Sequence, residues 1–157
     1  MAKRTYETDA IRVLWNSERC IHTGNCLRAL PAVFDTGKRP WVTIEGAAAD
    51  EIARAIERCP SGALQYERLD DDPGEQPPKA TTIVPRRTGP LYVRGDVTVE
   101  TPGGAMERGY RMVLCRCGAS RNQPFCDNSH KDIGFSDNPR VIPTYREAAD
   151  DPSDLEE

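Results

Sequence analysis

The sequence predicts an α+β protein built from two small domains. Its 157 residues are enough for two such domains or for one of medium size. Residues 68–80, RLDDDPGEQPPKA, are acidic and rich in turn-forming residues, so we interpret them as a linker. The six cysteines fall into two groups of three on either side of it. We therefore expect domains over residues 1–67 and 81–137, followed by a disordered acidic tail over 138–157 that lacks apolar periodicity.

The first domain is predicted to combine three short strands with one helix. IRVLW at 11–15, WVTIE at 41–45 and ALQYE at 63–67 alternate in polarity and are rich in β-forming residues. Residues 47–59 instead repeat apolar residues at helical spacing, and Pro60 prevents the helix from continuing. The predicted apolar face of this helix consists of Ala48, Ile52, Ala55, Ile56 and Cys59.

The second domain is predicted to be a small β-rich unit. Its segments are rich in β-forming residues, and glycine and proline between them mark turns. The expected strands are 81–85, 89–95, 97–100 and 110–117, with turns at TPGG (101–104) and CGAS (117–120).

Charge and hydropathy exclude several classes of partner. The formal net charge of −4 leaves no basic face for nucleic acid or for an anionic membrane, so neither is expected as a partner. No apolar run approaches the roughly 20 residues of a membrane-spanning helix, and the first ten residues lack the apolar core of a signal peptide. We therefore expect a cytoplasmic protein. In that reducing compartment, six cysteines are better suited to metal ligation or redox chemistry than to disulfides.

Four potential metal ligands gather in CRCGASRNQPFCDNSH, with the spacing C-x-C-x8-C-x3-H. Cys115 and Cys117 can bind one iron, because a C-x-C pair brings two thiolates together. Cys126 and His130 are four residues apart, so one turn of helix lets them bind a second iron from the same side. The pattern predicts a [2Fe-2S] cluster with three cysteine ligands and one histidine. A structural zinc site is the alternative, although its cysteines usually come in C-x2-4-C pairs.

This stretch resembles the CDGSH iron–sulfur family, also called NEET proteins, whose signature is C-x-C-x2-[ST]-x3-P-x-C-D-G-[ST]-H. Asn128 stands where the family usually has glycine, and because asparagine tolerates a left-handed backbone we expect the turn to survive. Asp127 stands where a helix N-cap is expected, so its carboxylate can hold backbone amides near the cluster. The resemblance extends over about residues 81–137 and implies the family's small β-rich fold and the four ligands. The matching residues are Cys115, Cys117, Ser120, Pro124, Cys126, Asp127, Ser129 and His130.

The first domain carries a second set of cysteines. Cys20 and Cys26 are separated by five residues, and Cys59 follows much later with a proline directly after it. This pattern is that of a bacterial ferredoxin in which Thr23 occupies the place of the middle cysteine. Three thiolates suit a [3Fe-4S] cluster with one thiolate for each iron. His22 could supply a fourth ligand to a [4Fe-4S] cluster, and buried apolar cysteines are the remaining interpretation.

The stretches CIHTGNCLRALPAVFD, RPWV and CPSGAL, within about residues 10–67, resemble the divergent single-cluster 4Fe-4S domain family. The resemblance implies a small ferredoxin-like domain, and in that family such a domain is often found beside a CDGSH domain. Trp15 and Trp41 are interpreted as ordinary core residues of this domain.

Two clusters and the absence of enzyme motifs favour an electron carrier over an enzyme. The sequence has no phosphate-binding glycine loop, no flavin or nicotinamide fingerprint and no nucleophile with a spare histidine. The leading hypothesis is a relay of single electrons between a redox partner protein and an acceptor. The second is cluster transfer to an apo-acceptor protein or redox and pH sensing, because the ligand His130 can be protonated near neutral pH. The third is a zinc-stabilised binding module.

We also expect a homodimer. A single CDGSH motif resembles half of a two-fold unit, and a small β domain with open strand edges can pair them with a second copy. The first domain could instead cover that edge.

Overall fold

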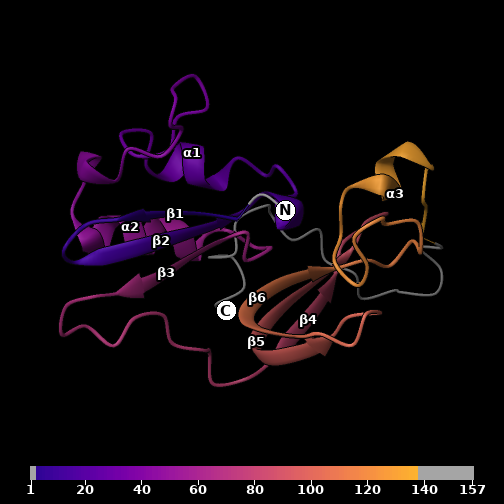
Figure 1. Cartoon of the computed structure of the whole chain (residues 1–157). Coiled ribbons are helices and arrows are strands. Elements are labelled where there is room, and N and C mark those ends of the chain that lie inside the picture. The colour runs from indigo at the N-terminus through magenta and orange to yellow at the C-terminus, as the bar shows by residue number, and fades with distance from the viewer. Residues whose placement is uncertain (1–2, 138–157) are drawn as a thin grey trace.

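The computed structural model describes residues 3–137, and the tail predicted over 138–157 lies outside the described residues. Two three-stranded antiparallel sheets lie in separate parts of the chain (Figure 1), in the strand orders β1-β2-β3 and β4-β5-β6. This is a mixed α/β architecture of two small units, as predicted. The first unit contains β1 (Lys3–Glu7), β2 (Ile11–Asn16), the 3-10 helix η1 (Ser17–Arg19), α1 (Asn25–Ala29), the 3-10 helix η2 (Ile44–Gly46), α2 (Ala49–Glu57) and β3 (Leu64–Arg68). The second unit contains β4 (Thr82–Pro85), β5 (Leu91–Glu100), β6 (Met106–Leu114) and the short helix α3 (Ser129–Asp132).

The core of the first unit forms between its sheet and α2. Ile11 and Val13 alternate along the central strand β2 and are fully buried, as the period of a half-buried strand requires. They share one cluster with Ile52 and Ile56 on the buried face of α2. Helix α2 begins where the Glu51 carboxylate accepts a hydrogen bond from the Ala48 backbone amide at 3.1 Å. The predicted helix is therefore confirmed, although it is shorter than expected and Ala48 is exposed.

The prediction of a strand over residues 41–45 is wrong. Val42 makes only an isolated bridge with Phe34, and the following residues form η2. The alternation that indicated a strand arises because Val42, at this bridge, and Ile44, in η2, are both buried in the core. The sheet gains its third strand from β1 instead. That strand, KRTYE, is mostly exposed and charged, so it carries no apolar alternation for a sequence to reveal.

The second sheet has β5 at its centre, between β4 and β6. The two strands predicted over 89–95 and 97–100 are one strand whose register shifts between Arg94 and Val97. Gly95 lies in this irregularity at φ +153°, and a Cβ there would lie 2.3 Å from the Thr81 hydroxyl. The glycine therefore marks a bulge and a close approach of two strands, where the sequence indicated a break. Strand β6 also starts earlier than predicted and ends just before Cys115.

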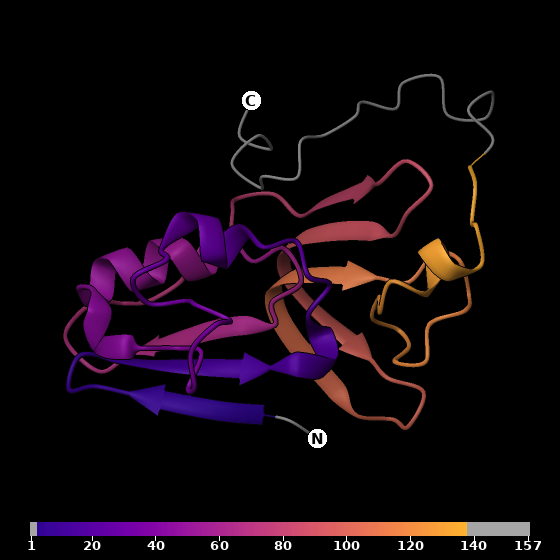
Figure 2. The same cartoon turned by 90° about the horizontal axis from the view of Figure 1, so that it is seen from above.

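Arg111 on β6 binds the two units together. Its guanidinium is buried and donates to the backbone carbonyls of Ile56, Cys59 and Leu64 in the first unit. It also pairs with Glu75, at 2.6 Å between Arg111 Nε and Glu75 Oε1. Glu75 belongs to the predicted linker, which has neither helix nor strand between β3 and β4 but is anchored here. The two units are thus packed against each other, as the two views of the chain also show (Figures 1 and 2).

Candidate metal centres

The four predicted ligands of the second domain lie as two close pairs. Cys115 Sγ lies 3.8 Å from Cys117 Sγ, and Cys126 Sγ lies 3.6 Å from His130 Nδ1. Tetrahedral metal sites have bonds of about 2.3 Å to sulfur and about 2.0 Å to nitrogen, which places two ligands of one ion about 3.5 to 3.8 Å apart. Each pair therefore has the separation of two ligands on one metal ion. Two such pairs fit the two irons of a [2Fe-2S] cluster.

A loop that folds back on the end of β6 brings these pairs together. The Cys126 amide donates to the Val113 carbonyl at 2.9 Å, and the Cys115 amide donates to the Pro124 carbonyl at 2.8 Å. The Ser120 hydroxyl closes the loop by donating to the Phe125 carbonyl at 2.6 Å. Serine and proline of the signature thus shape the backbone that carries the ligands.

Backbone amides point at two of the ligand sulfurs. The Ala119 amide lies 3.4 Å from Cys117 Sγ, and the Asn128 amide lies 3.4 Å from Cys126 Sγ. Burial raises the pKa of the Cys126 thiol, and the negative charges of Cys115 and Cys117 raise it further. Three neighbouring thiolates therefore need a compensating cation. Metal binding supplies one, so the donor set fits a metal group.

The prediction that Asp127 is the helix N-cap is wrong, although its carboxylate does hold backbone amides. Asn128 is the N-cap of α3, at φ +72°, which confirms that asparagine accepts the left-handed turn. Asp127 accepts hydrogen bonds from the Arg121 amide at 2.9 Å and the Ser129 amide at 3.0 Å. Burial opposes its ionisation, but hydrogen bonds from Ser129 and from the Arg121 amide lower the pKa of Asp127 to about 2. Its ionised carboxylate ties the middle of the ligand loop to the start of α3.

His130 is suited to metal ligation in its neutral form. Burial lowers the pKa of its imidazole, and the charge of Lys131 lowers it further. A neutral imidazole keeps a lone pair on one nitrogen, which a metal ligand requires.

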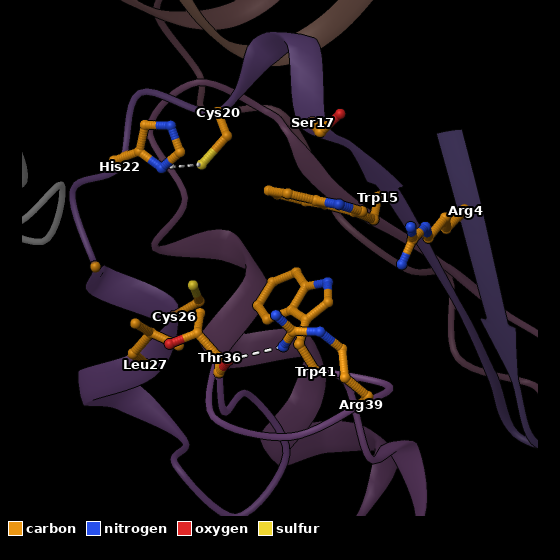
Figure 3. A pocket seen from close by; sticks show the side chains of 11 residues that line it. Arg4, Trp15, Ser17, Cys20, His22, Cys26, Leu27, Thr36, Arg39 and Trp41 are labelled. Carbon is orange, nitrogen blue, oxygen red and sulfur yellow. Dashed lines mark hydrogen bonds between the residues drawn. The ribbon is translucent and has the colours of Figure 1, made fainter. Parts of the chain in front are cut away.

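The three cysteines of the first domain lie within electrostatic reach of one another. Cys20 follows η1, Cys26 lies in α1, and Cys59 follows α2. Burial raises the pKa of the Cys26 thiol to about 11, and the negative charges of Cys59 and Cys20 contribute to this rise. The three thiols are thus close enough to interact electrostatically. Cys20 and Cys26 point toward the same space in Figure 3. Three thiols within reach of one another fit a cuboidal cluster with one thiolate for each of three irons.

His22 lies beside this set in a left-handed conformation, at φ +60°. Its Nδ1 lies 3.7 Å from Cys20 Sγ, as the dashed line in Figure 3 shows. Each iron of a cuboidal cluster has room for one protein ligand, because inorganic sulfide fills its other positions. A histidine so close to a ligand sulfur is better suited to donate a hydrogen bond to it than to bind a different iron. The geometry favours His22 as a neighbour of the cluster.

A pocket of about 450 Å³ opens beside Cys20 and Cys26 (Figure 3). Trp15 and Trp41 line it with their ring centroids 4.8 Å apart, and Arg4 and Arg39 flank them. Both tryptophans pack on the core, as the sequence predicted, but both are only partly buried. Their second role as pocket walls could not be predicted, because it depends on a loop conformation.

The donors do not converge on a point that would hold a single metal ion. Within residues 3–137, no group of three or more histidine, cysteine or acidic side chains is arranged to do so. The zinc interpretation requires four such donors around one ion, whereas the donors of the second domain form two pairs.

Comparison with known proteins agrees with both donor sets. A family model for the divergent 4Fe-4S mono-cluster domain matches residues 6–69, and one for the iron-binding zinc finger of CDGSH type matches residues 88–131. The uncharacterized proteins YjdI of Escherichia coli K12 and of Escherichia coli O157:H7 are each 35% identical over 63 residues. This similarity lies in the N-terminal part and covers 40% of this chain and 83% of each YjdI chain.

These matches and the two donor sets define a protein with two iron–sulfur binding domains. The chain belongs to the CDGSH iron–sulfur family, with a divergent single-cluster 4Fe-4S domain fused at its N-terminal side. The family assignment made from the sequence is thereby confirmed. Separately, none of the helices in the described part of the chain has the length and apolar character needed to cross a membrane.

Proposed function

We propose that this protein is a carrier of single electrons with two clusters. One is a [2Fe-2S] cluster bound by Cys115, Cys117, Cys126 and His130, and the other is a cuboidal cluster bound by Cys20, Cys26 and Cys59. The observation that carries this proposal is the pairing of the ligands, with donor atoms 3.8 Å and 3.6 Å apart in the second domain. When bound, iron–sulfur clusters accept and release one electron at a time. In this function the protein is not an enzyme.

The side chains and amides around the ligands suit an electron carrier. The amides of Ala119 and Asn128 can donate to thiolate sulfurs, which stabilises negative charge and raises a reduction potential. Ile21 and Val113 pack against Cys126 and exclude water from its sulfur. Low local polarity and fixed hydrogen bonds reduce the rearrangement that a change of charge requires.

The form of the first cluster follows from the number of thiolates. Three cysteines favour [3Fe-4S], and we propose this form with a ferredoxin-like domain around it. The alternative is [4Fe-4S], which the name of the matching family supports. It would need a fourth ligand from outside the three cysteines.

Cluster transfer to an apo-acceptor is the second candidate function. The observation that favours it is the position of His130 on α3, a helix of only four residues next to the exposed Ile133. A neutral imidazole at such an edge is the ligand most easily exchanged for one from an acceptor. The same feature would suit a redox or pH sensor. A carrier keeps its cluster through repeated reduction and oxidation, whereas a transfer protein loses it to an added apo-ferredoxin, so this experiment separates the two candidates.

The partners that this proposal implies are redox proteins of the cytoplasm, and a second copy of the chain. Strand β1 is an open edge of the first sheet, but its charged side chains disfavour pairing. Strand β4 is an open edge of the second sheet and carries Ile83, which is 60% exposed. We therefore propose that a homodimer forms through β4.

A further inference from the structure

The two proposed cluster sites approach each other at one side chain. Asn128 Nδ2 donates a hydrogen bond of 2.8 Å to the backbone carbonyl of Ile21, which is 107 positions away in the sequence. Ile21 directly follows Cys20. The backbone amide of the same Asn128 lies 3.4 Å from Cys126 Sγ. One residue thus contacts a ligand of the second site and the immediate neighbour of a ligand of the first.

Buried apolar contacts surround Ile21, and further contacts join the same two segments on either side. Ile21 is 7% exposed and packs against Val113 and Cys126. On either side the same two segments are joined again: Asn122 Nδ2 donates to the Glu18 carbonyl at 2.8 Å, and the Arg19 guanidinium lies 4.4 Å from the Phe125 ring centroid. Residues 18–21 therefore run along the loop that carries Cys126. Figure 2 shows this end of the first unit against the loop leading to α3.

A buried positive charge lies in the same interface. Arg19 is 5% exposed, and its Nε and Nη2 have no hydrogen-bond partner among the described residues. Burial lowers its pKa, while the negative charges of Glu107 and then of Cys59 act to raise it, so the guanidinium lies within electrostatic reach of both groups. A cation here stabilises electrons on the neighbouring thiolate-bound groups.

We propose that Asn128 connects the two cluster sites, so that single electrons pass between them within one chain. The path runs from Cys126 through the Asn128 amide and side chain to the Ile21 carbonyl and Cys20. One electron moves from the reduced site to the oxidised site, and no bond is made and no proton is transferred. An external one-electron reductant supplies that electron. This inference rests on the proposed function, because it requires a redox group at each site.

The presence of asparagine at position 128, where the family signature has glycine, is consistent with this role. A glycine at position 128 would accept φ +72° and would keep the amide that points at Cys126. It would have no side chain to reach Ile21. Asparagine is thus the residue that keeps the turn and adds the contact between the sites.

The test compares two variants in the cluster-loaded protein. Asn128→Gly removes only the side-chain contact with Ile21, and Asn122→Ala removes a hydrogen bond of the same kind that touches no ligand. Rapid photochemical injection of less than one electron per chain is followed by visible absorption as the electron redistributes between the sites. We expect this redistribution to slow severalfold in Asn128→Gly and to remain unchanged in Asn122→Ala. In Asn128→Asp, the aspartate tolerates the same turn but lacks the side-chain donor. Its electron redistribution should be as slow as in Asn128→Gly, so it replaces the glycine variant in the test if that variant does not fold.

Electron paramagnetic resonance separates a role in electron transfer from a merely structural one. The magnetic interaction between the two reduced centres reports their separation, and it should be unchanged in Asn128→Gly. Unchanged redistribution in both Asn128 variants would overturn the inference, as would an equal slowing in Asn122→Ala or an altered magnetic interaction. If each site of the parent protein is reduced but no electron passes between them, the inference fails while the proposed carrier function stands. If the sites hold no redox group, the proposed function itself fails.

Discussion

Arg111 on β6 donates a hydrogen bond to the backbone carbonyl of Cys59, so the strand that leads to Cys115 holds the ligand loop of the other domain. The same guanidinium binds the carbonyls of Ile56 and Leu64 and pairs with Glu75. Arg111 is 4% exposed, which leaves no room for water to replace it. The two ligand sets are therefore fixed relative to each other by a buried charge.

Arg111→Met should strongly destabilise the protein. It removes a hydrogen-bond donor from three backbone carbonyls and leaves the Glu75 carboxylate without its ion-pair partner. Breaking a buried ion pair on one side costs about 3–5 kcal/mol. Thermal and urea unfolding of the purified protein measure this loss. Arg108→Met is the matched control, because Arg108 pairs with Asp96 on the surface. The control should change the free energy of unfolding by no more than about 1 kcal/mol. Equal effects of the two substitutions would contradict the role assigned to Arg111.

The sequence indicated which donors could come together better than it indicated their surroundings. Spacing alone singled out Cys115, Cys117, Cys126 and His130 as candidate ligands, and the structure places them as two close pairs. The apolar periodicity of β2 and of α2 is also a local feature, and it was sufficient to predict this strand and this helix. The contact between Asn128 and Ile21 joins segments 107 positions apart, and no local pattern carries that information. The one available signal was an asparagine where the signature has glycine.

The contacts of Arg111 on β6 could not be predicted from a local pattern either. The apolar run MVL after it indicated a buried strand, but a lone arginine in such a strand does not reveal its partners. Its acceptors are backbone carbonyls, which every residue has, so their identity follows only from the packing of the two units. The prediction for 41–45 failed for a related reason, since alternation records burial and not hydrogen-bond pairing.

The purified protein should be coloured and should contain both iron and acid-labile sulfide. One [2Fe-2S] and one cuboidal cluster correspond to about five or six iron atoms per chain. Metal analysis and a sulfide assay give this ratio directly. Cys117→Ser should remove the iron of one cluster only, and Cys26→Ser that of the other. Stoichiometric zinc without sulfide would mean that neither site holds a cluster.

Electron paramagnetic resonance should detect an oxidised [3Fe-4S] cluster in the protein as isolated. This form is paramagnetic when oxidised, whereas an oxidised [4Fe-4S] cluster of a low-potential ferredoxin is silent. His22→Ala should retain the signal, because His22 Nδ1 lies 3.7 Å from Cys20 Sγ as a hydrogen-bonding neighbour. A sample that is silent when oxidised would reject the [3Fe-4S] form, and a signal on reduction beyond that of the reduced [2Fe-2S] cluster would then indicate four irons. Appearance of the signal only in His22→Ala would identify His22 as the fourth ligand.

The protein should be a dimer in solution that depends on β4. Ile83→Lys places a charge on the open edge and should shift the mass measured by light scattering toward the monomer. Leu69→Lys is a control with a similar change, because Leu69 is also exposed but follows β3 in the other sheet. A monomer mass for the parent protein across dilution would refute the dimer.

His130→Cys should lower the reduction potential of the [2Fe-2S] cluster and slow its transfer to an apo-acceptor. His130 Nδ1 lies 3.6 Å from Cys126 Sγ, so the substitution acts beside a proposed ligand. A thiolate is anionic whereas the imidazole is neutral, so the substitution adds negative charge to the cluster and makes reduction harder. Replacement of thiolates by histidines raises potentials in Rieske centres, and the reverse change should act in the opposite direction.

A redox titration followed by visible absorption measures the potential, and incubation with apo-ferredoxin measures transfer. His22→Cys is the matched control, since it makes the same substitution at the other histidine and should leave the [2Fe-2S] potential unchanged. An unchanged potential in His130→Cys would show that His130 does not bind the cluster. A lower potential with transfer as fast as in the parent would keep His130 as a ligand but would remove the main support for cluster transfer, because the histidine would then not be the ligand that releases the cluster.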